Sequence, residues 1–390
     1  MYAGRLEAVP EKKYLFTPGP TPVPPQVLAA LAEPVLHHRG ADFKPIFERC
    51  LARLREICRT ESEVLVYTAS GTGAMESVGA NLCSEGTRAL VVSAGSFGER
   101  WEQIAALHGA TVEPMRYEWG EIPRAQDVAT RLEELGGTDV VFLTHSETST
   151  GVVADIQELA AVAKEAGALV AVDAISSLGA VPLEFDAWGL DAVASGSQKA
   201  LMTPPGLALC AVSPAALAAA KPSRSYYFDW ARTHKAQAKL DAAFTPATSL
   251  VVALDVALGL LLDEGLEAAF ARHVRLGRAT RAGAKAMGLE LFSPDDDRSA
   301  VVTAIRAPEG IDSGDIVRGV RTRFGMTIAN GQGHLQGAIF RLGHIGWFDV
   351  FDITTALAAV ELVLVELGAD IERGAAVTAA LEAYEHATVT

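Results

Sequence analysis

The sequence predicts an α/β fold: a large domain with a mostly parallel sheet covered by helices, followed by a smaller C-terminal α+β domain. Six short apolar runs, each typical of a buried strand, alternate with helix-length segments. Continuous apolar strands separated by helices indicate a parallel sheet with both faces covered. The chain has 390 residues, of which 49% are hydrophobic and 21% charged, so it can bury a sizeable core. We therefore expect an N-terminal extended arm over residues 1–22, a large domain over 23–262 and a small domain over 263–390.

The arm is rich in proline from Phe16 to Pro25. Proline fixes φ and lacks an N–H donor, so this stretch cannot form a helix or an inner strand. Its apolar residues, Leu15, Phe16 and Val23, indicate that the arm packs against something, such as a second subunit. A helix is expected next, because apolar residues recur at helical spacing between Phe43 and Cys58.

The central part of the chain supplies the sheet. The predicted strands are 64–68, 89–93, 140–144, 168–173, 192–195 and 207–212, and helical patterns include 73–83, 98–108 and 155–166. In parallel sheets, ligands bind beyond the carboxyl ends of the strands. After one long predicted helix over 249–272, with an acidic break near Asp263, the pattern changes. Strands at 300–305, 326–329 and 338–342 and helices at 313–324 and 350–367 then predict the smaller α+β unit.

Composition excludes several classes of partner. A formal charge of −15 argues against nucleic acid, which needs clustered Lys and Arg to neutralise phosphates. No apolar run is long enough to cross a membrane, and no signal peptide opens the chain, so we expect no membrane partner. The four cysteines form no CxxC pair, which favours reduced thiols and a cytoplasmic protein. Neither His334 nor His344 has the spacing of a metal ligand, so we expect no metal site.

Lys199 is the residue around which the predicted chemistry is arranged. It follows an apolar strand and precedes Ala200-Leu201-Met202, and burial of a lysine among apolar neighbours lowers its pKa, as a nucleophile toward carbonyl groups requires. Asp173 ends another apolar strand. By itself such an aspartate is usually a cap or turn residue. Together the two match the fixed groups of a pyridoxal phosphate (PLP) site, in which the lysine forms a Schiff base and the aspartate pairs with the pyridinium nitrogen.

A phosphate-binding loop is predicted at Ala69-Ser70-Gly71-Thr72-Gly73, which follows the first strand and opens a helix. Small residues let backbone N–H groups approach a phosphate, and the helix dipole favours the anion. An ordinary N-cap turn would look similar. A dinucleotide fingerprint fits less well, because the next position of that pattern is Glu76, whose carboxylate would repel a pyrophosphate.

Two further strand ends carry candidate residues. Phe97 follows the second strand, where an aromatic ring can stack on a flat heterocycle, although a ring in such a loop more commonly belongs to the core. The hydroxyl-rich loop 145–151, which includes Thr148, follows the third strand and could donate to a ring substituent. A plain turn would explain that loop nearly as well.

Arg341 is the most informative residue of the smaller domain. A guanidinium on the apolar strand 338–342 needs an anionic partner. That partner is either a substrate carboxylate, which arginine holds through two hydrogen bonds, or an internal Asp or Glu.

The order of these motifs closely resembles that of the class V PLP-dependent aminotransferases, in particular the alanine–glyoxylate and serine–pyruvate group. The resemblance extends over nearly the whole chain. The motifs that carry it are Pro18-Gly19-Pro20, Ser70-Gly71-Thr72-Gly73, Glu147-Thr148-Ser149-Thr150-Gly151, Asp173, Ser195-Gly196-Ser197-Gln198-Lys199 with Pro204-Pro205-Gly206, and Phe340-Arg341-Leu342-Gly343.

The resemblance implies a fold-type I PLP enzyme that forms a homodimer with active sites at the subunit interface. It implies catalytic roles for Lys199 and Asp173, and these further positions: Phe97 stacked on the PLP ring, Thr148 beside the ring, Ser70, Gly71, Thr72 and Gln198 at the phosphate, Thr245 at the phosphate of the neighbouring subunit, and Gly19 and Arg341 at the substrate. One position departs from the pattern. Some relatives bring a tyrosine to the phosphate three residues before this threonine, where this chain has Ala242.

The expected reaction is transfer of the amino group of alanine or serine to glyoxylate or pyruvate by a ping-pong mechanism. A single recognisable arginine motif favours a donor with one carboxylate over a dicarboxylate. The alternatives are ureidoglycine–glyoxylate or 2-aminoethylphosphonate transamination, or another class V PLP reaction such as that of a lyase. A cysteine desulfurase is disfavoured, because it needs a nucleophilic cysteine late in the chain and none follows Cys210.

Overall fold

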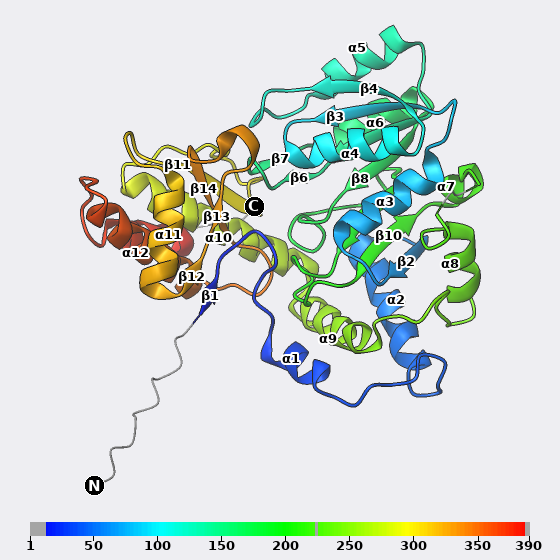
Figure 1. Ribbon diagram of the computed structural model, residues 1–390, viewed down its shortest axis with the longest axis horizontal. Coiled ribbons are helices and arrows are strands. Elements are labelled where there is room, and N and C mark those ends of the chain that lie inside the picture. The colour runs from blue at the N-terminus through cyan, green and yellow to red at the C-terminus, as the bar shows by residue number, and fades with distance from the viewer. Residues whose placement is uncertain (1–12, 223–224, 387–390) are drawn as a thin grey trace.

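The computed structural model describes residues 13–222 and 225–386, and its largest feature is a seven-stranded sheet (Figure 1). In spatial order the strands are β2 (Glu63–Tyr67), β10 (Ala208–Val212), β9 (Ala192–Gly196), β8 (Leu169–Asp173), β5 (Val140–Thr144), β3 (Arg88–Ser93) and β4 (Thr111–Arg116). Only β10 runs antiparallel to its neighbours. The predicted α/β fold with a mostly parallel sheet is confirmed. Edge strand β4 was not predicted, because Pro114 and its charged, partly exposed residues hide the apolar pattern of a strand.

Helices cover both faces of this sheet. One face carries α3 (Gly71–Leu82), α4 (Ser96–Leu107), α7 (Pro214–Ala219) and α8 (Trp230–Gln237), and the other α2 (Lys44–Cys58), α5 (Ala125–Leu135), α6 (Ile156–Glu165) and α9 (Thr248–Glu264). The pleat of β2 shows the division, because Val64 packs with the α2 side and its neighbour Leu65 packs with the α3 side. Both faces are therefore buried, as the continuous apolar strands indicated.

The acidic break predicted near Asp263 in the long helix over 249–272 is confirmed, but it divides that helix completely. The segment forms two helices, α9 and α10 (Leu266–Ala286), separated at Gly265. The φ angle of Gly265 is +86°, in the left-handed region that ends a helix and that glycine adopts without a Cβ clash. The apolar pattern continues across the break, so periodicity alone cannot reveal it.

The C-terminal part has its own core. A three-stranded antiparallel sheet of β11 (Val302–Arg306), β14 (Ile339–Gly343) and β13 (Ala329–Asn330) packs with α10, α11 (Ser313–Phe324), α12 (Val350–Glu366) and α13 (Ala375–Glu385), and a 3-10 turn spans η1 (Gly333–Leu335). The strand predicted over 326–329 is divided between two sheets. β12 (Met326–Thr327) pairs with the N-terminal arm, whereas β13 joins β14.

The arm packs on its own chain. β1 (Tyr14–Leu15) runs parallel to β12, and the ring of Phe16 stacks on Phe348 at 5.6 Å between centroids. From there the chain crosses to the large sheet and forms the short α1 (Pro25–Leu31). Residues 1–12 of the predicted arm lie outside the described residues.

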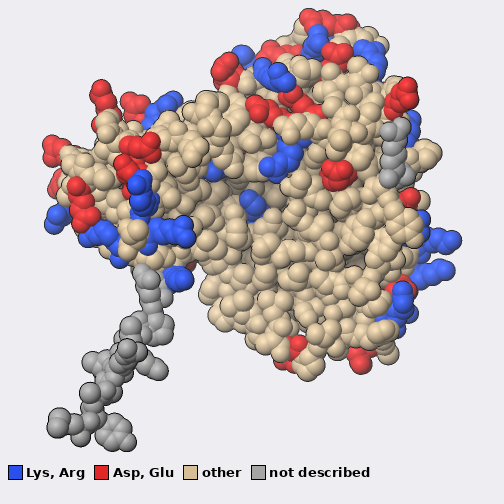
Figure 2. Space-filling view, viewed as in Figure 1, with Lys and Arg blue, Asp and Glu red and all other residues tan. Residues whose placement is uncertain are grey.

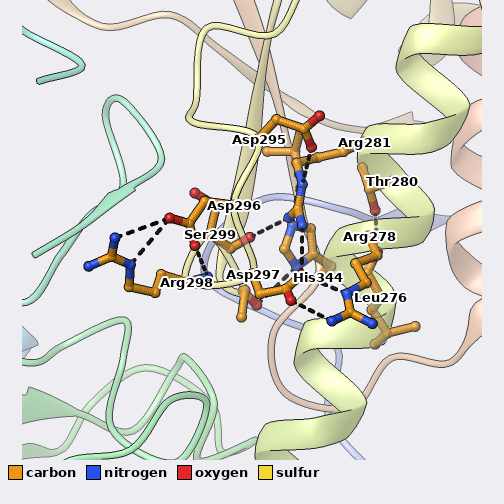
Figure 3. Close-up of polar contacts among 12 residues, drawn as sticks. Leu276, Arg278, Thr280, Arg281, Asp295, Asp296, Asp297, Arg298, Ser299 and His344 are labelled. Carbon is orange, nitrogen blue, oxygen red and sulfur yellow. Dashed lines mark hydrogen bonds and ion pairs between the residues drawn. The ribbon is translucent and has the colours of Figure 1, made fainter. Parts of the chain in front are cut away.

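A group of paired charges fixes the loop that precedes β11 (Figure 3). We call it the paired-charge cluster; it consists of Arg278, Arg281, Lys285, Asp295, Asp296, Asp297 and Arg298. Buried Arg281 donates to Asp295 at 3.0 Å and to the Ser299 carbonyl at 3.1 Å. The same loop bonds to the loop 148–151 beyond β5, because Ser293 Oγ donates to the Thr150 carbonyl and Ser299 Oγ to the Gly151 carbonyl, both at 3.2 Å. The cluster therefore supports one wall of the site described next.

Two kinds of feature are absent from the described residues. No helix among them has the length and apolar character needed to cross a membrane. In the same residues, no group of three or more His, Cys, Asp or Glu side chains could hold a metal ion.

Candidate active site

A cavity of about 230 Å³ lies at the carboxyl edge of the parallel strands. It brings together nine of the residues predicted from the sequence: Gly19, Ser70, Gly71, Thr72, Phe97, Thr148, Asp173, Gln198 and Lys199. They come from segments far apart in the chain, and they meet because the carboxyl ends of parallel strands lie on one edge. Two predicted residues, Thr245 and Arg341, do not line this cavity.

Lys199 follows β9 and projects toward the N-terminal arm. Its Nζ donates a hydrogen bond to the Pro18 carbonyl at 2.6 Å. Burial is the main cause that lowers the pKa of Lys199 to about 8; Asp173 opposes the shift, and the positive charges of Arg341 and Arg100 add to it. The amine is therefore neutral, and nucleophilic, at a lower pH than that of an ordinary lysine.

Asp173 ends β8 and is only 3% exposed. Its Oδ1 accepts a hydrogen bond from the Ile175 amide at 2.8 Å. Burial raises the pKa of Asp173 to about 7, and the negative charge of Glu147 adds to the shift, whereas Lys199 and Arg100 oppose it. A carboxylate so poorly solvated is stabilised by a cationic partner, and a protonated ring nitrogen would be one.

Two glycines make room for the backbone to approach the site. A Cβ on Gly19 would overlap the side chain of Lys199, and the φ of Gly19, +132°, is one that other residues rarely adopt. A Cβ on Gly71 would lie 2.8 Å from Ile175 Cδ1. Both positions therefore require glycine.

The end of the cavity at α3 suits an anion. Ser70 is the N-cap of α3, yet its side chain makes no capping hydrogen bond, so the hydroxyl is available to a ligand. Among the described residues, Gln198 Oε1 and Ser146 Oγ are buried without a hydrogen-bond partner, and both residues line the cavity. Buried polar atoms that the chain leaves without partners are available to hydrogen-bond a ligand. Together with the helix N-terminus and the facing Lys199 and Asp173, these groups fit PLP.

Glu147 is a residue whose role the sequence reasoning missed. It is 3% exposed, its Oε2 accepts from the Phe97 amide at 3.0 Å and the Gly98 amide at 3.1 Å, and its Oε1 accepts from the Ser149 amide at 3.1 Å. The carboxylate thereby caps the first turn of α4, which carries Phe97, and joins it to the loop that carries Thr148. The available signal was an acid three residues beyond a buried strand. The polar loop that carries it forms the short hairpin β6 (Ser146–Glu147) and β7 (Val152–Val153).

Arg341 lies on β14, behind the loop that carries Thr148. Its Nη1 donates to the Thr148 carbonyl at 2.5 Å, and its Nε and Nη2 donate to the Asn330 carbonyl at 3.0 and 2.8 Å. In the described part of the chain no carboxylate forms an ion pair with it, so the internal ion pair considered as an alternative is absent there. Burial lowers the pKa of Arg341 to about 10, and the charge of Glu147 opposes the shift.

Thr245 lies apart from the Lys199 cavity. It is exposed and lines a separate open hollow with His37, His38 and Pro246. Within one chain it therefore cannot act on the ligand that Lys199 holds. The lining of the Lys199 cavity does include Arg100, which the sequence reasoning did not select.

Comparison with known proteins identifies the family. Residues 13–344 match the sequence profile of the family Aminotransferase class-V. The chain is a class-V aminotransferase. Two relatives match it over nearly its full length. It is 42% identical to the "Soluble hydrogenase 42 kDa subunit" of Anabaena cylindrica, over 96% of this chain and 100% of that one. It is 34% identical to the serine–glyoxylate aminotransferase of Methylorubrum extorquens, over 95% and 96%.

The solved structures agree with this assignment. The crystal structure of ureidoglycine–glyoxylate aminotransferase from Bacillus subtilis superposes with a TM-score of 0.93 and 31% identity, over 97% of this chain and 100% of that one. The fold of this class-V aminotransferase is thus that of the fold-type I PLP enzymes, which confirms the predicted fold class. The family implies PLP as the cofactor.

Proposed function

We propose that this aminotransferase uses PLP, held at Lys199, to move the amino group of alanine or serine to glyoxylate or pyruvate by a ping-pong mechanism. The observation that carries the proposal is the shared cavity of Lys199 and Asp173, in which burial shifts the pKa values of both groups toward neutrality. Perturbed pKa values in one cavity are typical of active sites.

The residues of the cavity have separate roles in this proposal. When bound, PLP supplies an electron-withdrawing ring and carries the amino group between the two half-reactions. Asp173 would pair with the ring nitrogen, Phe97 would stack on the ring, and Ser70, Gly71, Thr72 and Gln198 would donate to the phosphate. Lys199 Nζ is the proposed base that takes the proton from Cα of the amino donor. Gly19 leaves room beside this amine for the substrate.

Arg341 is the proposed partner of the substrate carboxylate. The described part of the chain supplies it with carbonyl acceptors only, so its positive charge stays available for an anion. Because one of those carbonyls belongs to Thr148, a carboxylate held by Arg341 would lie beside the loop that we place at the cofactor ring.

The alternative substrate is ureidoglycine, with glyoxylate as the acceptor. The superposition on the B. subtilis ureidoglycine–glyoxylate aminotransferase favours it as the second candidate. Transamination of 2-aminoethylphosphonate has no comparable support from a similar structure; this donor has no carboxylate, so its phosphonate would have to bind at Arg341.

We also propose a homodimer with shared active sites. Figure 2 shows that the face over α1 and α9 carries few charged side chains. Leu28 and Val35, on and just after α1, are 51% and 78% exposed, which is typical of a surface that another subunit covers. Exposed Thr245 lies in a hollow beside Val35, so a partner placed here would receive Thr245 at its phosphate. The cytoplasmic location expected from the four unpaired cysteines stays a prediction.

The test begins with the purified protein. We expect it to bind PLP and then to absorb light at the boundary between the near-ultraviolet and the visible. Borohydride reduction should leave the cofactor attached to the peptide that contains Lys199. Lys199→Ala should abolish that attachment, whereas Lys285→Ala, a change in an exposed lysine of the paired-charge cluster, should leave it intact. Reduction that labels another lysine, or none, would contradict the proposal.

A screen of donors against acceptors then separates the substrates. Alanine, serine, ureidoglycine and aspartate would each be paired with glyoxylate, pyruvate and 2-oxoglutarate. The largest kcat/KM is expected for alanine or serine with glyoxylate or pyruvate. A preference for ureidoglycine would support the alternative.

A further inference from the structure

Arg100 is a cation in the wall of the active site that the proposed function does not use. It lies in the second turn of α4, three residues after Phe97, and it lines the Lys199 cavity. Its guanidinium carbon lies 4.7 Å from the centre of the Phe97 ring. Its Nη1 donates to Thr72 Oγ1 at 3.1 Å. Arg100 therefore lies between the residue proposed to stack on the cofactor ring and the loop proposed to hold the phosphate.

The positive charge of Arg100 is not neutralised by the chain. Among residues 13–222 and 225–386, no carboxylate forms an ion pair with it. The two acids nearest in sequence on α4 are engaged elsewhere, since Glu99 accepts from Trp119 Nε1 at 2.9 Å and Glu102 accepts from Arg116 at 2.5 Å. The charge does reach the site, because it lowers the pKa of both Lys199 and Asp173. A half-buried arginine without an acid is typical of an anion-binding site.

The phosphate end of the cavity otherwise has only neutral donors. Ser70, Thr72 and Gln198 offer hydroxyl and amide groups, and Gly71 offers backbone at a helix N-terminus. A phosphate monoester carries close to two negative charges at neutral pH. In this proposal Lys199 is bonded to the aldehyde carbon of the cofactor and not to its phosphate, and Arg341 does not line the cavity. Arg100 is the remaining cation of the lining.

We propose that Arg100 binds the phosphate group of the cofactor, from the same chain as Lys199. The contact with Thr72 supports this position. Because Thr72 Oγ1 accepts from the guanidinium, its own proton is free to donate to a phosphate oxygen, so both side chains would face one anion. The ring of Phe97 beneath the guanidinium holds it in place. This inference rests on the proposed use of PLP.

The experiment measures how much the phosphate group contributes to cofactor binding. Apoenzyme is titrated with PLP and with pyridoxal, which lacks the phosphate, and the absorbance of the Lys199-bound form gives each Kd. The ratio of the pyridoxal Kd to the PLP Kd reports the phosphate alone. Arg100→Gln should lower this ratio by about 10- to 100-fold, since a hydrogen bond to a charged group is lost. Arg100→Lys should restore part of it, because the charge is kept without the guanidinium.

Controls separate this role from a structural one. Arg318→Gln, which removes an exposed arginine on α11, should leave the ratio unchanged. A thermal melt of each variant shows whether it folds. If Arg100→Gln does not fold, Arg100→Lys tests the proposal by itself, because it too must lower the ratio below that of the wild type. A ratio unchanged in a folded Arg100 variant overturns the proposal.

The rival ligand is the second carboxylate of a dicarboxylic substrate. With PLP saturating, the kcat/KM for aspartate relative to alanine should be the same in the wild type and in Arg100→Gln. A selective loss of aspartate turnover with an unchanged pyridoxal to PLP ratio would assign Arg100 to the substrate and overturn the phosphate assignment. If the wild type attaches no PLP at Lys199, the proposed function itself fails. If PLP attaches normally but the Kd ratio does not change in the Arg100 variants, only the role of Arg100 fails.

Discussion

The cations of the active site and those of the paired-charge cluster differ in the partners that they bind. In the cluster, Arg281 meets Asp295 at 3.0 Å, and Lys285 meets the same carboxylate at 2.6 Å. In the site, Lys199 and Arg341 donate to backbone carbonyls, and Arg100 donates to a hydroxyl. Figure 2 shows red and blue side chains side by side at the periphery of this face.

The difference shows which charges serve the fold and which serve a ligand. A cation paired within the chain is stabilised by its partner and gains little from an added anion. A cation left with neutral acceptors keeps its attraction for an anion that the chain does not supply. The two regions are also connected, because the loop of the cluster bonds to the carbonyls of Thr150 and Gly151 at the edge of the site. The cluster should therefore affect stability, and the site cations should affect binding and turnover.

The largest effect is expected for Lys199→Ala. Removing the proposed base should lower kcat by about 10²- to 10⁴-fold or more, since proton transfer alone contributes that much. Stability should not fall, because a poorly solvated amine is removed. Transaminase assays and urea unfolding would measure the two quantities, with Lys285→Ala as the matched control. Near-normal turnover in Lys199→Ala would mean that this amine is not the base, and the functional contrast between the two groups of cations would fail.

Arg341→Ala should come next in size. Loss of carboxylate pairing should reduce kcat/KM for the amino donor by the equivalent of about 2–5 kcal/mol. Initial-rate kinetics with alanine or serine would measure this. Arg306→Ala, on the neighbouring strand β11 with an exposed side chain, serves as the control and should change little. An unchanged KM in Arg341→Ala would mean that the substrate carboxylate binds elsewhere.

Arg281→Gln should act on stability instead of on substrate binding. Its charged hydrogen bonds to Asp295 and the Ser299 carbonyl are lost, which should cost about 1.5–3 kcal/mol in the free energy of unfolding. Arg318→Gln breaks an exposed pair on α11 and should cost no more than about 0.5 kcal/mol. Urea denaturation gives both values. A stable Arg281→Gln protein whose amino-donor KM is strongly raised would reverse the assignment of the two regions.

The smallest expected effect is the pH dependence of cofactor capture. The pKa of Lys199 is lowered to about 8, so the neutral amine that attacks PLP predominates above that pH and becomes about tenfold scarcer for each pH unit below it. The rate of PLP attachment to apoenzyme should rise as pH increases and level off above about pH 8. Stopped-flow absorbance would measure it. A rate that keeps rising toward the ordinary lysine pKa would mean that burial does not shift this amine.

Much of the fold could be predicted because it depends on local patterns. The apolar runs that became β5, β8 and β9 are continuous, so they indicated buried strands and placed Thr148, Asp173 and Lys199 at one edge. Elements with weaker patterns were missed. Strand β4 is partly exposed, and α13 lies beyond the last strand with no motif to mark it. The acidic break near Asp263 was predicted, but the full division into two helices at Gly265 was not, because glycine can continue an apolar pattern while ending the helix.

For the site, the sequence by itself determined the residues whose chemistry is unusual for their surroundings: a lysine and an aspartate at the ends of buried strands, and an arginine in an apolar strand. Only the tertiary structure decided which charges are neutralised and by what. Arg100 has two acids beside it on its own helix yet faces the cavity without a carboxylate, whereas Arg281 has no acid close to it on its helix and is paired with Asp295 of the following loop. The physical reason is that an electrostatic interaction depends on distance and solvation in space, and these contacts join residues that lie far apart along the chain.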